Sequence, residues 1–252
     1  MKLFRPHYLD DTGQVYYTVV IPGGGYLDGD RYEMAVELGA GASLLFTTQS
    51  ATKVYRTPEK GVGQVLRMKL AEHSVLEYLP DQLIMYREGR YFQTTSVDMA
   101  SSSSAFLAEI VTPGWSPRGE LFAYDELWMR TDITVDGKLA GADNFHIRPT
   151  TVDSTQDNPL IFAGRTHAAT VFVVDPHLDE REISRLRPMV EDWARAYRGG
   201  TMLVGLSELT VPGFTLRALG SHTDDLMDLI TKLANELRSR FRDQGPIDLR
   251  KY

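Results

Sequence analysis

The stretch RYEMAVEL, residues 31–38, shows the alternation that decides the fold class of this chain. Apolar side chains occupy every second position, from Tyr32 to Leu38, and Arg31, Glu33 and Glu37 lie between them. A period of two residues is that of a β-strand with one buried face. The stretch therefore predicts a half-buried strand.

Similar short runs recur on both sides of this stretch and are separated by turn signals such as Asp-Gly, Glu-Gly and Pro-Gly. This spacing is typical of many short strands in two layers or in β-helix-like stacked sheets. We therefore predict a mainly β, multi-stranded body over residues 1–159. The runs are VYYTVVI (15–21), SLLFTT (43–48), QVLRMKL (64–70), SVLEYL (74–79), RYFQTTSV (90–97), AFLAEIV (105–111) and LWMRTDITV (127–135).

The pattern changes after about residue 160, beyond a polar segment at 149–159 that reads as a loop. A strand-like run, AATVFVV, precedes apolar residues at every third or fourth position from Ile183 to Tyr197, which predicts a helix closed by Gly199 and Gly200. Pro188 is expected to kink or split this helix.

Two further strand-like runs, TMLVGLSEL and FTLRALG, lead to a second predicted helix. Ser221 and Asp224 have the spacing of a capping pair at its start, and an apolar stripe runs from Leu226 to Phe241. The order strand, helix, strand, strand, helix predicts an α+β C-terminal subdomain over 160–252. Both helices should lie on one face of its sheet, and the subdomain should pack on the β body.

Composition limits the function classes. The chain has 252 residues and a formal net charge of −7, so it lacks the overall cationic field that nucleic-acid binding requires. It contains no cysteine, which excludes disulfides, thiolate metal sites and cysteine nucleophiles. No run approaches the roughly 18–20 apolar residues of a membrane span, and the N-terminus has no signal pattern. We therefore expect a cytoplasmic protein that binds neither nucleic acid nor membrane.

The glycine-rich run IPGGGYLDGDRY, residues 21–32, could cradle a phosphate, hold a metal or turn the chain. A phosphate loop needs a helix after the glycines, whereas a strand is predicted here, and the run fits neither G-x-x-x-x-G-K-[ST] nor G-x-G-x-x-G. Tight turns that need positive φ are the favoured interpretation. The residues alone leave open whether Asp30 caps a turn or contacts a hard metal.

Other candidate sites are weaker. The serine run 101–104 lacks the surrounding pattern of a nucleophile elbow and is more typical of a solvated turn. The six histidines are dispersed without metal-ligand spacing; His146, near Asp143 and Asn144, has the most polar surroundings. The residues by themselves thus indicate a largely β protein without a catalytic constellation. A β-rich hydrolase or small-ligand-binding domain that uses the glycine loop is the alternative hypothesis.

Longer blocks resemble the urease accessory proteins of the UreD type, also called UreH. The blocks are GGGYLDGDRYEMAVELGAGASLLFTTQSATKVYR, LEYLPDQLIMYREGRYFQTT, EIVTPGWSPRGELFAYDEL and VPGFTLRALG, and together with the final helix and the terminal LRKY they cover nearly the whole chain. Family members usually begin with some thirty to forty further residues. If strands encoded there are missing, an exposed sheet edge is expected.

The resemblance implies a non-enzymatic role in the maturation of nickel-dependent urease. Proteins of this type are understood to bind the urease apoprotein and UreF, which recruits the GTPase UreG, and to hold no tightly bound cofactor. They are also thought to conduct nickel in transit through an internal passage.

Such a passage needs weak, spaced oxygen ligands, because a tight site would stop the ion. Matching the family blocks nominates Asp30, Thr52, Glu109 and Asp143 as its lining, and Glu77 as a weaker candidate. For each of the four lining residues, the alternative is a hydrogen-bonded turn or a strand-end residue.

Overall fold

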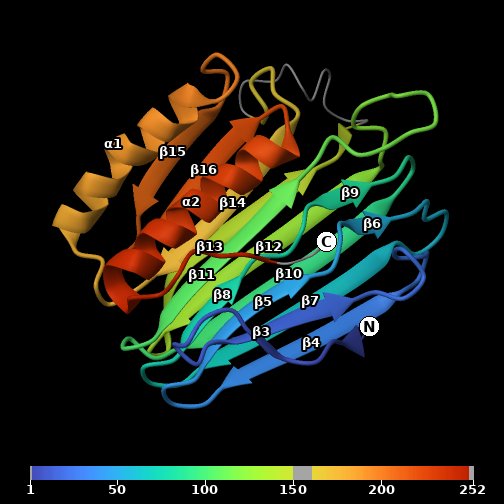
Figure 1. The fold of residues 1–252 in the computed structure, drawn as a ribbon. Coiled ribbons are helices and arrows are strands. Elements are labelled where there is room, and N and C mark those ends of the chain that lie inside the picture. Colours follow the sequence, from blue (N-terminus) through green and yellow to red (C-terminus); the bar gives the residue numbers. More distant parts are fainter. Residues whose placement is uncertain (1, 150–160, 250–252) are drawn as a thin grey trace.

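The computed structural model describes residues 2–149 and 161–249, which form two stacked β-sheets with two helices against one of them (Figure 1). The larger sheet has eleven strands and the smaller has five. The larger sheet contains β1 (Lys2–Leu3), β2 (His7–Tyr8), β3 (Val15–Val20), β5 (Ser43–Thr48), β6 (Thr52–Val54), β8 (Val75–Tyr78), β9 (Leu83–Met85), β11 (Ser104–Val111), β14 (His167–Val174), β15 (Leu203–Glu208) and β16 (Gly213–Gly220). The smaller sheet contains β4 (Arg31–Leu38), β7 (Val62–Leu70), β10 (Arg90–Met99), β12 (Glu126–Val135) and β13 (Lys138–Ile147).

The chain winds back and forth between the two sheets, so that strands from successive coils pair in parallel. In the larger sheet Leu44 pairs with Leu76 and Leu76 with Ala105, and in the smaller sheet Leu66 pairs with Thr95. Parallel pairing between strands that alternate between two layers is the arrangement of a flattened β-helix. The predicted β-helix-like stacking with a C-terminal α+β part is confirmed.

The RYEMAVEL stretch forms β4, and its odd-numbered positions are exposed while its even-numbered positions are partly buried, as predicted. Strand β4 ends the smaller sheet and pairs only with β7 in the strand order. Strand β13 at the opposite edge was not predicted. Its sequence KLAGADNFHI carries few apolar residues because only part of one face is covered, so the alternation that reveals the other strands is weak.

Helices α1 (Glu180–Ala196) and α2 (Thr223–Arg242) lie side by side on the outer face of the larger sheet, as predicted (Figure 1). One apolar core lies between this face and the helices, and two others fill the space between the sheets. Strands β14, β16 and β15 continue the larger sheet beyond the body. The division of the chain at residue 159 stays a prediction, and the loop predicted around it lies, apart from Pro149, outside the described residues.

Two local predictions about the helices can be compared with the structure. Pro188 lies inside α1 without splitting it, because the surrounding turns pack their buried residues on the sheet and tolerate the lost hydrogen bond, and the kink at this residue stays a prediction. The capping pair Ser221–Asp224 is wrong, since His222 is the N-cap residue of α2 and makes no side-chain capping bond. Neither helix is long and apolar enough to cross a membrane.

Candidate functional site

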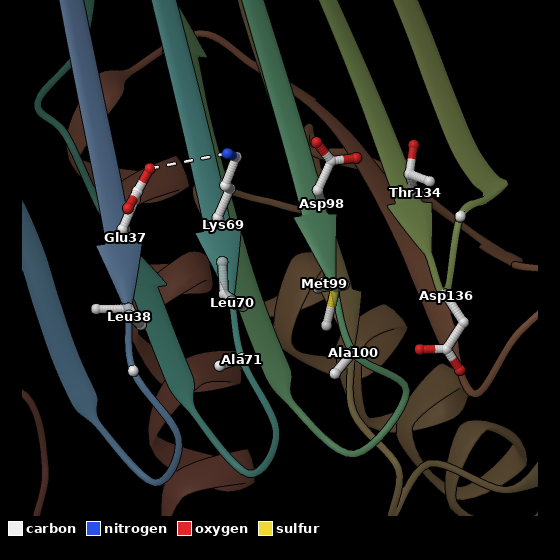
Figure 2. A pocket seen from close by; sticks show the side chains of 12 residues that line it. Glu37, Leu38, Lys69, Leu70, Ala71, Asp98, Met99, Ala100, Thr134 and Asp136 are labelled. Carbon is white, nitrogen blue, oxygen red and sulfur yellow. Dashed lines mark ion pairs between the residues drawn. The ribbon is translucent and has the colours of Figure 1, made fainter.

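A hollow of about 630 Å³ is an open depression at the ends of β4, β7, β10 and β12 (Figure 2). Glu37, Asp98 and Asp136 lie along it, and Lys69 Nζ is 3.8 Å from a Glu37 carboxylate oxygen. None of the nominated residues lines this depression. No group of three metal-ligating side chains occurs here or elsewhere in residues 2–149 and 161–249. Size alone therefore does not make this depression the functional site.

A smaller cavity of about 30 Å³ lies between the two sheets and is lined mainly by polar side chains. This volume suits a water molecule or a small ion. Both Thr52 and Glu109 line it, so the structure brings two of the four nominated residues together. Gln64, Tyr91 and Gln93 from the smaller sheet, together with Tyr78 and Asp81, complete its polar wall.

Glu109 points into the space between the sheets because of its register in β11. Its neighbours Ala108 and Ile110 face the helices and belong to the core there, so alternation along the strand turns Glu109 the other way. Gln93 Nε2 donates a hydrogen bond to Glu109 Oε1. Burial raises the pKa of the Glu109 carboxyl to about 7; the Gln93 hydrogen bond lowers it and the charge of Asp143 raises it. Near neutral pH the group exists in both protonation states.

Thr52 begins β6 at the mouth of the same cavity. Its backbone N–H donates to the Gln82 carbonyl at 3.0 Å, which joins the start of β6 to the residue that precedes β9. The short strand pairs in parallel with β9, and Thr52 lies opposite Leu83. The hydroxyl is thus a neutral oxygen ligand held on regular backbone beside the Glu109 cavity.

Asp30 lies in the turn before β4 and does not line the cavity. Its Oδ2 accepts hydrogen bonds from the Leu27 N–H at 2.9 Å and from the Tyr32 hydroxyl at 2.8 Å. Asp30 N–H in turn donates to the Leu27 carbonyl at 3.0 Å. These bonds are those of a turn-capping carboxylate, the interpretation that the sequence left open.

A line of polar and aromatic side chains nevertheless runs from the Asp30 turn to the cavity. The Tyr32 ring stacks on Tyr26 with centroids 4.1 Å apart, and the Tyr26 hydroxyl donates to Gln64 Oε1 at 2.6 Å. Gln64 Nε2 lies 3.4 Å from Gln93 Oε1, and Gln93 reaches Glu109. The ring stack is the one step in this line that is not a hydrogen bond.

Asp143 lies on β13, at the edge of the smaller sheet, opposite Thr131 of β12. Its Oδ1 accepts from Arg217 Nη2 at 2.5 Å, and Arg217 belongs to β16 of the larger sheet. The side chains of this ion pair are 23% and 39% exposed, respectively. The pair therefore bridges the two sheets where the space between them meets solvent.

The chain shows sequence similarity to urease accessory proteins along its entire length. The family model described as UreD urease accessory protein matches residues 1–251. The chain belongs to the UreD family. It is 40% identical to the urease accessory protein UreD of Corynebacterium glutamicum strain R, over 100% of this chain and 88% of that protein. The proteins of the same name from Actinomyces naeslundii and Bacillus cereus are 41% and 32% identical, over 100% of this chain and 90% and 89% of theirs.

The glycine-rich turn of this UreD-family chain has the conformation that the sequence predicted. Gly23, Gly24 and Gly29 have φ of +103°, +82° and +85°, and the strand β4 follows them. Asp28 in the same turn accepts hydrogen bonds from three successive backbone N–H groups, those of residues 59–61. The turn thus docks on the next coil through its backbone.

The weaker candidate Glu77 lies on the other face of the larger sheet. It is 1% exposed and pairs with Arg238 of α2, which is fully buried. Gln14 donates to the same carboxylate, and Arg242 lies 3.6 Å from its second oxygen. This arrangement ties the C-terminal helix to the sheet, so Glu77 is separated from the Glu109 cavity by the sheet itself.

The cavity residues Gln64, Gln93 and Tyr91 were missed by sequence reasoning. In β7 and β10 the glutamines occupy positions in the same phase as the buried side chains of each strand. A polar side chain at an inward position of an alternating strand was therefore the available signal. Arg217 in FTLRALG lacks this signal, because it alternates with the buried Leu216 and Ala218 as a solvent-facing strand residue would.

Proposed function

We propose that this protein is a non-catalytic scaffold for urease maturation in the cytoplasm. It binds the urease apoprotein and UreF, and UreF recruits the GTPase UreG for nickel insertion. Membership of the UreD family and the names of the relatives, all urease accessory proteins, support an accessory role. The turn geometry of the glycine run, which lacks a following helix, fits a protein that leaves GTP chemistry to a partner.

We further propose that nickel passes through the polar space between the two sheets on its way to urease. Nickel is cargo here rather than a resident cofactor. The single observation that supports this passage is the Glu109 cavity, a carboxylate inside the protein surrounded by amide and hydroxyl oxygens. Divalent ions bind such oxygens, and a lining in which amide and hydroxyl groups outnumber the two carboxylates, Glu109 and Asp81, binds weakly enough to release the ion.

The residues nominated for the passage would have unequal roles. Glu109 and Thr52 would contact the ion in the cavity, and Asp143 would do so only after leaving Arg217. Asp30 would act at most at the polar opening, since its carboxylate is already used in the turn.

The test is a maturation assay with UreF, UreG, urease apoprotein and Ni²⁺. Wild-type protein should co-purify with UreF and show no turnover of its own. Glu109→Gln and Thr52→Val should leave the complex intact and lower the nickel content of urease. The matched control Glu37→Gln, in the open depression, should change neither the complex nor the nickel content. Full nickel delivery by the Glu109→Gln/Thr52→Val double variant would show that the ion does not use this cavity.

The alternative, a β-rich hydrolase or ligand-binding domain using the glycine loop and the serine run, has less support. Residues 101–103 form a turn before β11, in which Ser103 Oγ donates to the Ala100 carbonyl at 2.6 Å and Ser102 Oγ accepts from the His73 N–H. These hydroxyls hold neighbouring turns together. Saturable turnover of ester or amide substrates by the isolated protein, lost on Ser102→Ala, would favour this alternative over the scaffold.

A further inference from the structure

The space between the sheets opens to solvent at the edge formed by β13 and β16. On the helix side of β16, Leu216 and Ala218 have no exposed surface. On the opposite side, Thr215, Arg217 and Leu219 all keep partial exposure. Strand β13 is the last strand of the smaller sheet. The larger sheet continues past β16 with β15, in which Leu203 is 43% exposed. The smaller sheet therefore stops short of covering the larger one.

Polar side chains lead from this edge inward to the Glu109 cavity. In the larger sheet Glu109 pairs with Thr170 and Thr170 with Arg217, so the three lie in one row across neighbouring strands. Neighbouring strands are about 4.8 Å apart, which places Arg217 roughly 10 Å from Glu109 along the row. Thr170 is partly exposed although Ala169 and Val171 beside it are 1% and 0% exposed. The accessible surface of Thr170 therefore faces the space between the sheets.

The smaller sheet contributes a matching polar row. Asp143 pairs with Thr131, and Thr131 pairs with Thr95. Gln93 Nε2 is 3.2 Å from Thr95 Oγ1 and also donates to Glu109. The two rows thus begin together at the Asp143–Arg217 ion pair and meet again at the Glu109 carboxylate.

Arg217 is the one cation in these two rows. Its guanidinium binds Asp143 and lies 5.6 Å from the centroid of the Phe145 ring, which places it over that ring as well. A guanidinium in this position neutralises the carboxylate nearest to solvent and repels an approaching divalent cation. Because the side chain is long and 39% exposed, it can leave Asp143 for solvent without disturbing the strands.

We propose that the β13–β16 edge is a lateral mouth of the polar space, and that Arg217 is its gate. Paired with Asp143, Arg217 keeps divalent cations from the Asp143 carboxylate and from the row behind it. Displacement of Arg217 creates a cation site whose ligands are Asp143 and the neighbouring threonine hydroxyls. This inference deepens the proposed passage and rests on it for its biological use, but the cation site itself can be measured on the isolated protein.

The test is Ni²⁺ binding to the full-length purified chain by equilibrium dialysis at neutral pH and moderate salt. Arg217→Gln should bind one additional Ni²⁺ at Asp143, because the repelling charge is gone and Asp143 is free. The affinity of this site should be on the order of tenfold above the affinity of the same site in the wild type. The double variant Arg217→Gln/Asp143→Asn should lose this gain. Arg217→Lys retains a positive charge next to Asp143 and should bind as the wild type does.

The control is Arg130→Gln, which removes an arginine paired with Asp132 on the solvent face of β12 and should leave Ni²⁺ binding unchanged. Melting temperatures within a few degrees of the wild type verify that the variants are folded; if Arg217→Gln fails this check, Arg217→Ala and Arg217→Met replace it. Unchanged binding in the folded variants, or a gain that survives Asp143→Asn, overturns the gate. Nickel delivery to urease is scored separately: a gain in binding without any effect of Glu109→Gln on delivery would support the gate and reject the passage.

Discussion

Replacing Glu109 by glutamine should stabilise the protein at high pH and leave its stability at low pH unchanged. The glutamine oxygen can still accept the hydrogen bond from Gln93, so the substitution removes the ionisable group and little else. The pKa of this carboxyl is about 7 in the folded protein against an ordinary value of 4.5. A group whose pKa is raised by folding stabilises the fold below its unfolded pKa and loses that contribution as the pH rises to the folded pKa.

The size of the effect follows from this shift. Going from 4.5 to about 7, at 1.36 kcal/mol per pKa unit, gives a difference of about 3 kcal/mol between wild type and variant above pH 7. This is an upper limit, because water entering the cavity would solvate the carboxylate. The difference should fall to about 0.4 kcal/mol near pH 4.5, where the carboxyl is mostly protonated in the folded protein and half protonated in the unfolded chain.

Urea denaturation followed by tryptophan fluorescence, at about pH 4.5 and about pH 8, measures the free energy of unfolding at both ends of this window. The control is Glu37→Gln, whose wild-type side chain is 72% exposed and should change stability by less than about 0.5 kcal/mol at either pH. If the free energies of unfolding of wild type and Glu109→Gln differed by the same amount at the two pH values, the conclusion that folding raises the pKa of this carboxyl would be refuted.

Three further predictions concern stability and are read from urea or thermal unfolding. Glu77→Leu and Arg238→Met should each cost about 3–5 kcal/mol, because each removes the nearest charged partner of a buried group, while the double variant should be far milder; equal and additive costs would contradict the buried pair. Gly114→Ala should lower the free energy of unfolding more than Gly119→Ala does. Both glycines have positive φ, but only at Gly114 would the new Cβ meet the Met85 carbonyl. Equal losses of about 1–2 kcal/mol would mean that only φ matters. Pro188→Ala should stabilise the protein by up to about 3 kcal/mol by restoring a hydrogen bond in α1, and a loss of stability would show that the ring packs favourably.

The strands with clear apolar runs were the predictable part of the fold. The alternation in RYEMAVEL reflects the one covered face of β4, and the continuous run SLLFTT matches β5, which is buried on both faces; both stretches reproduce the bounds of their strands. The coil itself was not visible as an internal repeat, because Leu44, Leu76 and Ala105 occupy equivalent positions and share only apolar character. Parallel stacking needs matched burial and not matched sequence.

The site was less predictable than the fold for a related reason. Family resemblance nominated Glu109 and Thr52, and the structure places both at one cavity. The resemblance does not predict the hydrogen-bonding partners of these groups, since Arg217 is 74 residues from Asp143 in the chain and Glu77 is 161 from Arg238. Partners at such separations are chosen by the topology, which the sequence pattern leaves unspecified.

The arrangement of charges between the sheets bears on how an ion could move there. A cavity with several free carboxylates would bind a divalent cation tightly and hold it, whereas here Glu109 and Asp81 line the cavity among amide and hydroxyl groups. Asp143 is occupied by Arg217, and Asp30 by its own turn. An ion in the cavity would therefore meet the carboxyl groups of Glu109 and Asp81 among a larger number of neutral oxygens, which lowers the barrier to leaving as well as to entering. The carboxyl of Glu109 lowers the stability of the fold at neutral pH. Glu109→Gln should therefore change stability and nickel delivery in opposite directions, raising stability while it lowers nickel delivery.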